Sequence, residues 1–170
     1  SQHLSVLLHS IGDFERISDH AINIMEAAKE MHAKELDFSR KAREELGIYT
    51  GAIKDIINTS VLVFQEEDLK LAAMIEPMEE VIDYLSVEVK KRHMKRLRKG
   101  KCTIEMGFIL SDIVTNYERV SDHCSNIALS LLQLNEENFE AHEYQEAISS
   151  KDNVAFTTEV KHLKERYQLP

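Results

Sequence analysis

The sequence predicts an all-α protein, an antiparallel bundle of long helices. Its 170 residues include only two Pro and five Gly, too few for the turns that many short strands need. Apolar residues recur at alternating spacings of three and four, as they do along a helix that packs on other helices. Within residues 98–101 a Gly follows a basic stretch, which is typical of a helix end. So short a turn joins antiparallel neighbours.

The first helix is predicted over residues 2–34 and the second over residues 38–66. In the first, charged residues separate the apolar positions Phe14, Ile17, Ala21, Ile24, Ala28 and Met31. The second has a similar apolar spacing from Ala42 to Phe64. Gly47 and Gly51 lower the helix propensity in its middle, because glycine is about 1 kcal/mol less favourable in a helix than alanine.

The third helix is predicted over residues 68–98 and the fourth over residues 103–134. The third has apolar residues at Met78, Ile82, Leu85 and Val89. The fourth has a longer stripe, made of Ile113, Tyr117, Val120, Cys124, Ile127, Leu131 and Leu134. The tail, residues 136–170, is more polar and breaks at 149–153, so shorter helices are predicted over 138–148 and 154–168.

Charge and composition restrict the classes of partner. The formal net charge of −9 argues against a nucleic acid or an anionic membrane as the main partner and favours cations. No apolar stretch approaches the roughly 20 residues of a membrane-spanning helix, so no transmembrane segment is expected. The two cysteines, Cys102 and Cys124, are typical of reduced thiols rather than of a disulfide framework, which indicates a cytoplasmic location.

An internal repeat connects the first and fourth predicted helices. Residues 13–24 recur 103 positions later as residues 116–127, and seven of the twelve aligned residues are identical. A period of about 100 residues suits a duplicated three-helix bundle in which the matched segment is the third helix of each copy. Residues 1–34 would then be the third helix of a truncated first repeat, residues 38–134 the second repeat, and residues 136–170 a helical tail. His20 and His123, at matched positions, are expected to form hydrogen bonds between helices.

Three pairs of acidic residues form the candidate site. Each pair has the spacing Glu-x-x-x-Asp, which places both carboxylates on one face of a helix within about 6 Å. The pairs are Glu15 with Asp19, Glu79 with Asp83, and Glu118 with Asp122. One such pair is common on a solvated helix face, but three pairs, two of them inside the repeat, favour a cation site. Carboxylates suit Mg, Mn, Ca, iron or zinc, and bridging carboxylates favour clusters of ions.

The repeated segments resemble the signature of PhoU-like proteins, which are phosphate-uptake regulators built from two three-helix bundles. The resemblance rests on residues 15–24 and 118–127 and extends over about residues 1–135. The turn at 100–102, the segment 116–119 and the acidic segment 79–83 are similar to the C-terminal cytoplasmic PhoU-like domain of sodium/phosphate cotransporter family proteins. The implied fold is a PhoU-type antiparallel bundle, a duplicated three-helix bundle with its first repeat truncated.

The resemblance also implies a function. It indicates a non-enzymatic regulatory domain that binds metal and controls phosphate transport or phosphate signalling at the cytoplasmic face of a membrane protein. Multinuclear iron or zinc would be bound by the six paired carboxylates, with other divalent cations as alternatives. The partners would be membrane transporter segments, phosphate-transport or signalling proteins, and further copies of the chain. Because the first two helices of repeat one are absent, one cluster lacks its partner motif.

Two other functions are consistent with a helical bundle. A carboxylate-bridged di-iron oxidoreductase would need two inward-facing Glu-x-x-His motifs, and the sequence offers one, Glu159 with His162 in the polar tail. A metal-free oligomerisation domain would need the acids only to solvate helix faces. Metal content and the effect of acid substitutions on phosphate transport separate these alternatives.

Overall fold

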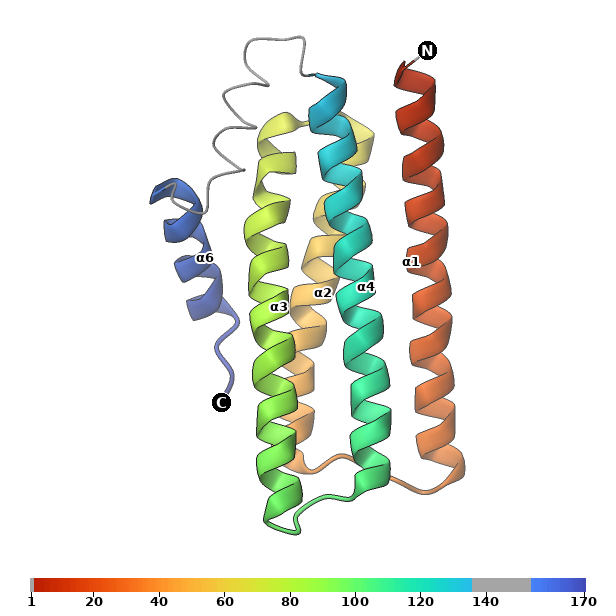
Figure 1. Ribbon diagram of the computed structural model, residues 1–170, viewed down its shortest axis with the longest axis vertical. Helices are drawn as coiled ribbons and strands as arrows, with labels where there is room; N and C mark the ends of the chain where they lie inside the picture. Colours follow the sequence, from red (N-terminus) through yellow and green to blue (C-terminus); the bar gives the residue numbers. More distant parts are fainter. Residues whose placement is uncertain (1, 136–153) are drawn as a thin grey trace.

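A computed structural model of the chain describes residues 2–135 and 154–170, and this part consists of five helices without a strand (Figure 1). The helices are α1 (Gln2–Ala33), α2 (Arg40–Glu66), α3 (Leu69–Arg98), α4 (Ile104–Leu134) and α6 (Val154–Arg166). The prediction of an all-α bundle is confirmed, and the long helices agree with the predicted ranges within two residues at each end. The predicted helix over 138–148 lies outside the described residues.

Three of the helices form an antiparallel bundle, and the other two pack on its outside. Helices α2, α3 and α4 contact one another, α1 lies along α4, and α6 lies along α3 (Figure 1). None of the described helices combines the length and the apolar composition that a membrane span requires. The division of the chain at residue 135 stays a prediction.

Polar side chains and left-handed residues fix the turns between the helices. Ser39, Asp68 and Thr103 cap the starts of α2, α3 and α4 by accepting hydrogen bonds from backbone N–H groups of the first turn. Gly100 ends the turn after α3 with φ of +64°, a conformation that glycine adopts without steric cost. The predicted turn at 98–101 is therefore confirmed.

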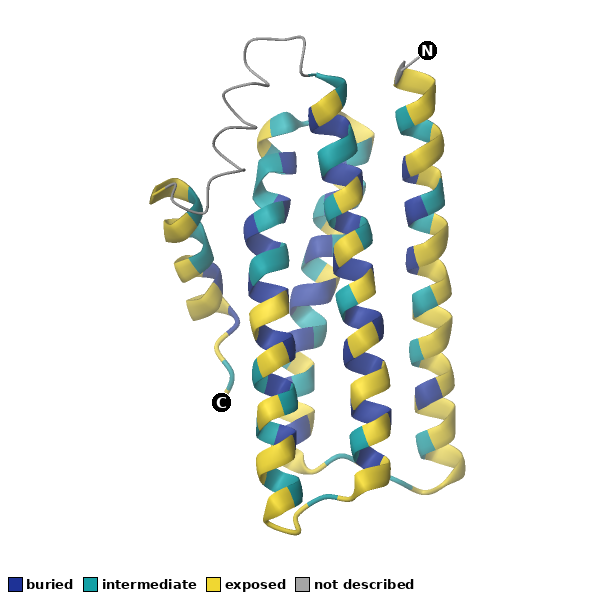
Figure 2. Cartoon of the chain, viewed as in Figure 1, coloured by how far each residue is buried: buried dark blue, intermediate teal, exposed yellow. Residues whose placement is uncertain are grey.

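Most of the core lies between α2, α3 and α4. The predicted stripes of α3 and α4 are buried there, apart from Leu134, which is half-buried (Figure 2). Helix α1 is mostly exposed, with its buried positions along the side that faces α4 (Figure 2). Gly47 and Gly51 lie inside an unbroken α2.

The predicted stripe of α1 is wrong at two positions, because Ala21 and Ala28 are exposed. Ser10, Asp13 and Ala27 are buried instead. The repeat gives the reason. The counterpart of Ala21 is Cys124 on α4, which is buried because α2 packs against that face of α4. Within the described residues, α1 has no helical hairpin of its own on that side, so the face stays in solvent.

A local two-fold relation connects α1 and α4. The imidazole of His20 lies 2.8 Å from Asn116 Oδ1, and that of His123 lies 2.9 Å from Asp13 Oδ1. These contacts are equivalent, because the repeat matches His20 with His123 and Asp13 with Asn116. The two imidazole rings stack with centroids 5.6 Å apart. The predicted hydrogen bonds between helices are confirmed, and the repeated motif forms the contact between its own two copies.

Candidate carboxylate site between α3 and α4

The antiparallel packing of α3 and α4 brings together two of the three predicted acidic pairs. Glu79 lies close enough to Asp122, and Asp83 close enough to both Asp122 and Glu118, for their charges to interact. Each Glu-x-x-x-Asp pair runs along its helix axis, so the antiparallel arrangement sets the Glu of one pair against the Asp of the other. Four carboxylates from two helices therefore share one seam.

The four carboxylates are held together against their mutual repulsion. Burial, the charge of Asp83 and a hydrogen bond with Asp83 raise the pKa of Glu79 to about 8, and Glu76 and Asp122 add to this effect. Asp83 and Asp122 are exposed, but partial desolvation against α4, followed by the charges of Asp122 and Glu118, raises the pKa of Asp83. Bringing a cation to this seam would relieve the repulsion.

Two serines and a lysine hold the outer carboxylates in place. Ser86 donates a hydrogen bond to Glu118, and Lys90 Nζ lies 3.2 Å from Glu118 Oε1. Toward the other end of the seam, Ser125 donates to Glu76. Within the part of the chain that the structure describes, no three Asp, Glu, His or Cys side chains converge on one point suited to a metal ion. Binding a metal ion would require Glu118 to turn away from Ser86 and Lys90.

A buried hydroxyl lies beneath the seam without a hydrogen-bond partner. Tyr49 is fully buried, and its Oη makes no hydrogen bond among the described residues. Burial, followed by the nearby Glu118 charge, raises its pKa, and the neighbouring Ser86 hydroxyl opposes this rise. Ser121, next to Asp122, has a second buried hydroxyl without a partner in the described chain. Unsatisfied buried polar groups are rare in native proteins and often mark the place of a water molecule or an ion. The Tyr49 hydroxyl therefore adds an oxygen atom close to Glu118 and Asp83.

The third predicted pair lies elsewhere. Glu15 and Asp19 are exposed on α1, which packs on α4 through a different face. The structure does not bring them into the seam of α3 and α4. Their role as metal ligands stays a prediction for a pair that has no partner motif among the described residues.

Several residues of the seam were absent from the predicted site. These are Tyr49, Glu76, Ser86, Lys90 and Ser125. On α3 the signal was present, because positions 76, 79, 83, 86 and 90 are separated by three or four residues and form one polar stripe. Tyr49 gave no such signal, since it comes from α2 and resembles an ordinary core residue.

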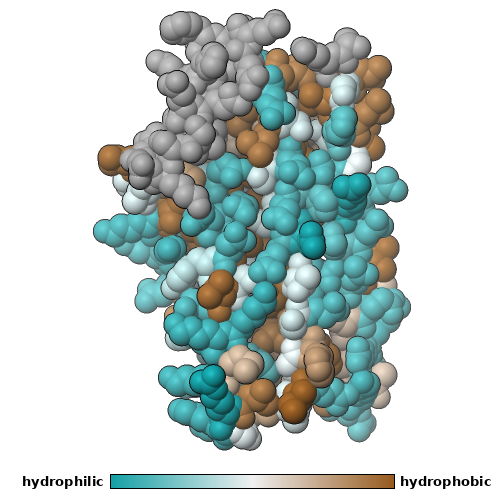
Figure 3. All heavy atoms as spheres, viewed as in Figure 1, coloured by the Kyte–Doolittle hydropathy of each residue, from teal (hydrophilic) through white to brown (hydrophobic). Residues whose placement is uncertain are grey.

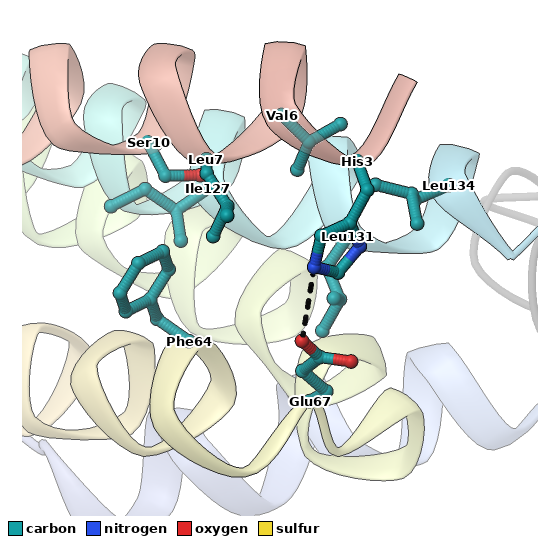
Figure 4. Close-up of a pocket in the computed structure, with 9 residues that line it drawn as sticks. All are labelled: His3, Val6, Leu7, Ser10, Phe64, Glu67, Ile127, Leu131 and Leu134. Carbon is teal, nitrogen blue, oxygen red and sulfur yellow. Dashed lines mark ion pairs between the residues drawn. The ribbon is translucent and has the colours of Figure 1, made fainter. Parts of the chain in front are cut away.

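Two other features, a hollow near the start of α1 and the Glu159–His162 motif, lack this chemistry. Figure 4 shows a small hollow between α1, α2 and α4 whose lining is mainly apolar, with His3 and Glu67 paired at 3.9 Å. Glu159 and His162 lie on α6, which packs outside the bundle, and the His162 side chain is 70% exposed. A di-iron centre in the bundle core therefore gains no support from this motif.

Comparison with known proteins gives two matches. Residues 50–131 match the model of the PhoU domain family, and this range includes all four carboxylates of the seam. The chain is 25% identical over 133 residues to the phosphate-specific transport system accessory protein PhoU homolog 1 of Thermotoga maritima. That alignment covers 78% of this chain but 56% of the relative, so the chain spans little more than half of the relative's length. No solved structure gives a match.

Proposed function

We propose that this chain is a non-enzymatic regulatory module of phosphate transport whose α3–α4 carboxylates bind metal. The observation that carries the proposal is the packing of Glu79 and Asp83 against Glu118 and Asp122, with raised pKa values at Glu79 and Asp83. The chain is also similar in sequence to a relative named as an accessory protein of phosphate-specific transport. The likeness to that relative supports a role in phosphate transport, and the carboxylates support the ligand.

The oxygen atoms of the four carboxylates determine which class of metal ion the site can bind. Four carboxylates can supply up to eight oxygen atoms, a set that suits iron, zinc or another divalent cation and can bridge more than one ion. The bound metal would supply positive charge that holds α3 and α4 together. Glu79 would release its proton on binding, and Glu118 would exchange Lys90 for the metal. Metal affinity should therefore rise with pH.

The regulatory role would be exerted through protein contacts. We place the module at the cytoplasmic face of a membrane protein, as part of a sodium/phosphate cotransporter or beside another phosphate-transport or signalling protein, with self-association as a further contact. The resemblance of the turn at 100–102 and the segment 116–119 to cotransporter domains supports this placement. It implies that the metal site changes transport activity without chemical turnover.

The experiment compares phosphate uptake in cells that produce the whole natural protein or its variants. The double variant Glu118→Gln/Asp122→Asn should alter the response of uptake to external phosphate. The matched control Glu26→Gln/Glu30→Gln removes two negative charges from the exposed face of α1, outside the predicted metal ligands, and should leave the response nearly unchanged. An unchanged response in the first variant, with normal protein level, would argue for a metal-independent function such as oligomerisation.

A further inference from the structure

Toward the Gly100 turn, the seam between α3 and α4 opens into a hollow that we call the α3–α4 groove. Lys90, His93, Met94 and Leu97 line it from α3, and Ile104, Gly107, Phe108, Leu110 and Ser111 line it from α4. Apolar side chains gather at this lower end of the face, bordered by hydrophilic ones (Figure 3). At Gly107, an added Cβ would lie 2.9 Å from His93 Nε2, so glycine allows α4 to approach α3 closely at the floor of the groove.

The walls of the groove are apolar and exposed. Phe108 is 73% exposed, Ile104 66% and Met94 47%. Ile104 and Phe108 are four residues apart on α4, as are Lys90 and Met94 on α3, so each wall follows one helix face. Burial lowers the pKa of His93, which keeps the floor uncharged. Such a contiguous apolar patch is typical of a binding surface.

The turn at the end of the groove is basic, in a chain whose net charge is −9. Residues 90–101 contain eight of the 21 Lys and Arg residues. Four of the eight are engaged: Arg92 and Arg96 pair with Glu45, Lys90 with Glu118, and Lys91 with Glu88. The other four, Lys95, Arg98, Lys99 and Lys101, form no ion pair within the described ranges. Arg98 and Lys101 belong to the segment that joins Leu97 to Ile104 at the end of the groove, whereas Lys95 lies on another face of α3. Free positive charge beside an apolar channel favours a ligand that is both apolar and acidic.

We infer that the α3–α4 groove binds an acidic amphipathic helix of a partner protein. The channel between residues 90 and 97 is about 10 Å long, so it accepts two turns of a helix lying along it. Apolar residues of the partner at helical spacing would contact Met94, Leu97 and Phe108, and its acidic residues would contact Arg98 and Lys101 at the end of the groove. A flat lipid surface would touch the rims of such a channel and leave its floor unfilled.

The groove also has a direct connection to the carboxylate site. Lys90 lines the groove and lies 3.2 Å from Glu118 Oε1. An acidic residue of the docked helix would compete with Glu118 for this ammonium group and leave the carboxylate free. The proposed docking does not depend on metal binding, since the apolar walls and the free basic residues are separate features.

The test uses two fluorescent synthetic peptides of identical composition, rich in Leu and Glu, with binding followed by fluorescence anisotropy. In one peptide the Leu residues share a helix face, and in the other they are scrambled. We expect the patterned peptide to bind the protein at least about tenfold more tightly than the scrambled one. The variants Phe108→Ser and Arg98→Gln/Lys101→Gln should each weaken that binding about tenfold. Because these side chains are exposed, the variants should fold normally, which circular dichroism checks.

Matched controls remove similar groups elsewhere. Leu8→Ser deletes an exposed apolar residue on α1, and Lys41→Gln/Lys54→Gln deletes two exposed lysines on α2. Both controls should bind the patterned peptide like the unmodified protein. Equal binding of the two peptides, or unchanged binding by the Phe108→Ser variant, would overturn the inference. So would Phe108-dependent sedimentation with phosphatidylserine vesicles, or Phe108-dependent self-association, in place of peptide binding.

Discussion

Replacing Glu79 with Gln should stabilise the metal-free protein at alkaline pH and leave it nearly unchanged at acidic pH. The folded protein retains the Glu79 proton up to about pH 8, whereas the unfolded chain releases it near the ordinary value of 4.5. Between these pH values the folded state binds more protons than the unfolded state, so the free energy of unfolding falls as pH rises. Gln has nearly the same shape as Glu but no charge, so it removes this loss.

The size of the effect follows from the pKa difference and the burial of the carboxyl. A pKa of about 8 in place of 4.5 sets an upper limit of about 5 kcal/mol above pH 8. Glu79 is only half-buried, and solvent screening reduces the expected effect to about 1–2 kcal/mol. At about pH 5 the two proteins should agree within about 0.5 kcal/mol.

Urea unfolding followed by circular dichroism, with a chelator present, measures both free energies. The control Glu66→Gln neutralises an exposed carboxylate at the end of α2 and should not change the pH dependence. If Glu79→Gln shifts the free energy equally at about pH 5 and about pH 9, or destabilises the protein at the higher pH, the carboxylates do not repel one another as described.

Three further substitutions test the fold. Glu45→Ala should lower the free energy of unfolding by about 3 kcal/mol, because it leaves Arg96, whose side chain is 13% exposed, without its carboxylate; a loss below about 1 kcal/mol in urea unfolding would contradict this. Asp13→Ala should lower the free energy of unfolding by about 1–2 kcal/mol because it leaves His123 unpaired, and Asp13→Asn should retain most of that stability. Equal stability of the unmodified protein and both variants would show that this contact does not stabilise the fold. Gly100→Ala should lower the melting temperature and reduce the free energy of unfolding by about 1 kcal/mol, because alanine is strained at the positive φ of this position while no atom crowds its Cβ. An unchanged melting temperature would refute this explanation.

The sequence predicted the helices well because their signals are local. Apolar spacing and the turn at Gly100 lie within short segments, and α3 and α4 bury the residues that this spacing selected. The prediction for Ala21 was wrong although its spacing is that of a buried position. The equivalent residue of α4, Cys124, is buried because α2 packs on that face, whereas no helix packs on the same face of α1 among the described residues. Apolar spacing does not reveal whether such a partner helix is present. Asp13 was not expected in the interface because polar residues there depend on a specific partner, His123.

The candidate site was predictable in part for the same reason. The Glu-x-x-x-Asp pairs are visible in sequence, and two of them meet because α3 and α4 are antiparallel. The side chains that surround these pairs depend on the register between the packed helices. This register is set by contacts between residues far apart in the sequence, so local spacing does not predict it. Ser86 and Lys90 contact Glu118 only in the register that packing selects, and Tyr49 approaches from a third helix.

Metal content tests the central claim most directly. Protein purified without a metal-affinity column is compared by elemental analysis with Glu118→Gln/Asp122→Asn and with the α1 control Glu26→Gln/Glu30→Gln. We predict iron, zinc or another divalent metal in the unmodified protein, its loss from the Glu118→Gln/Asp122→Asn variant, and its retention in the α1 control. Equal metal content in the unmodified protein and the Glu118→Gln/Asp122→Asn variant would contradict a metal site between α3 and α4.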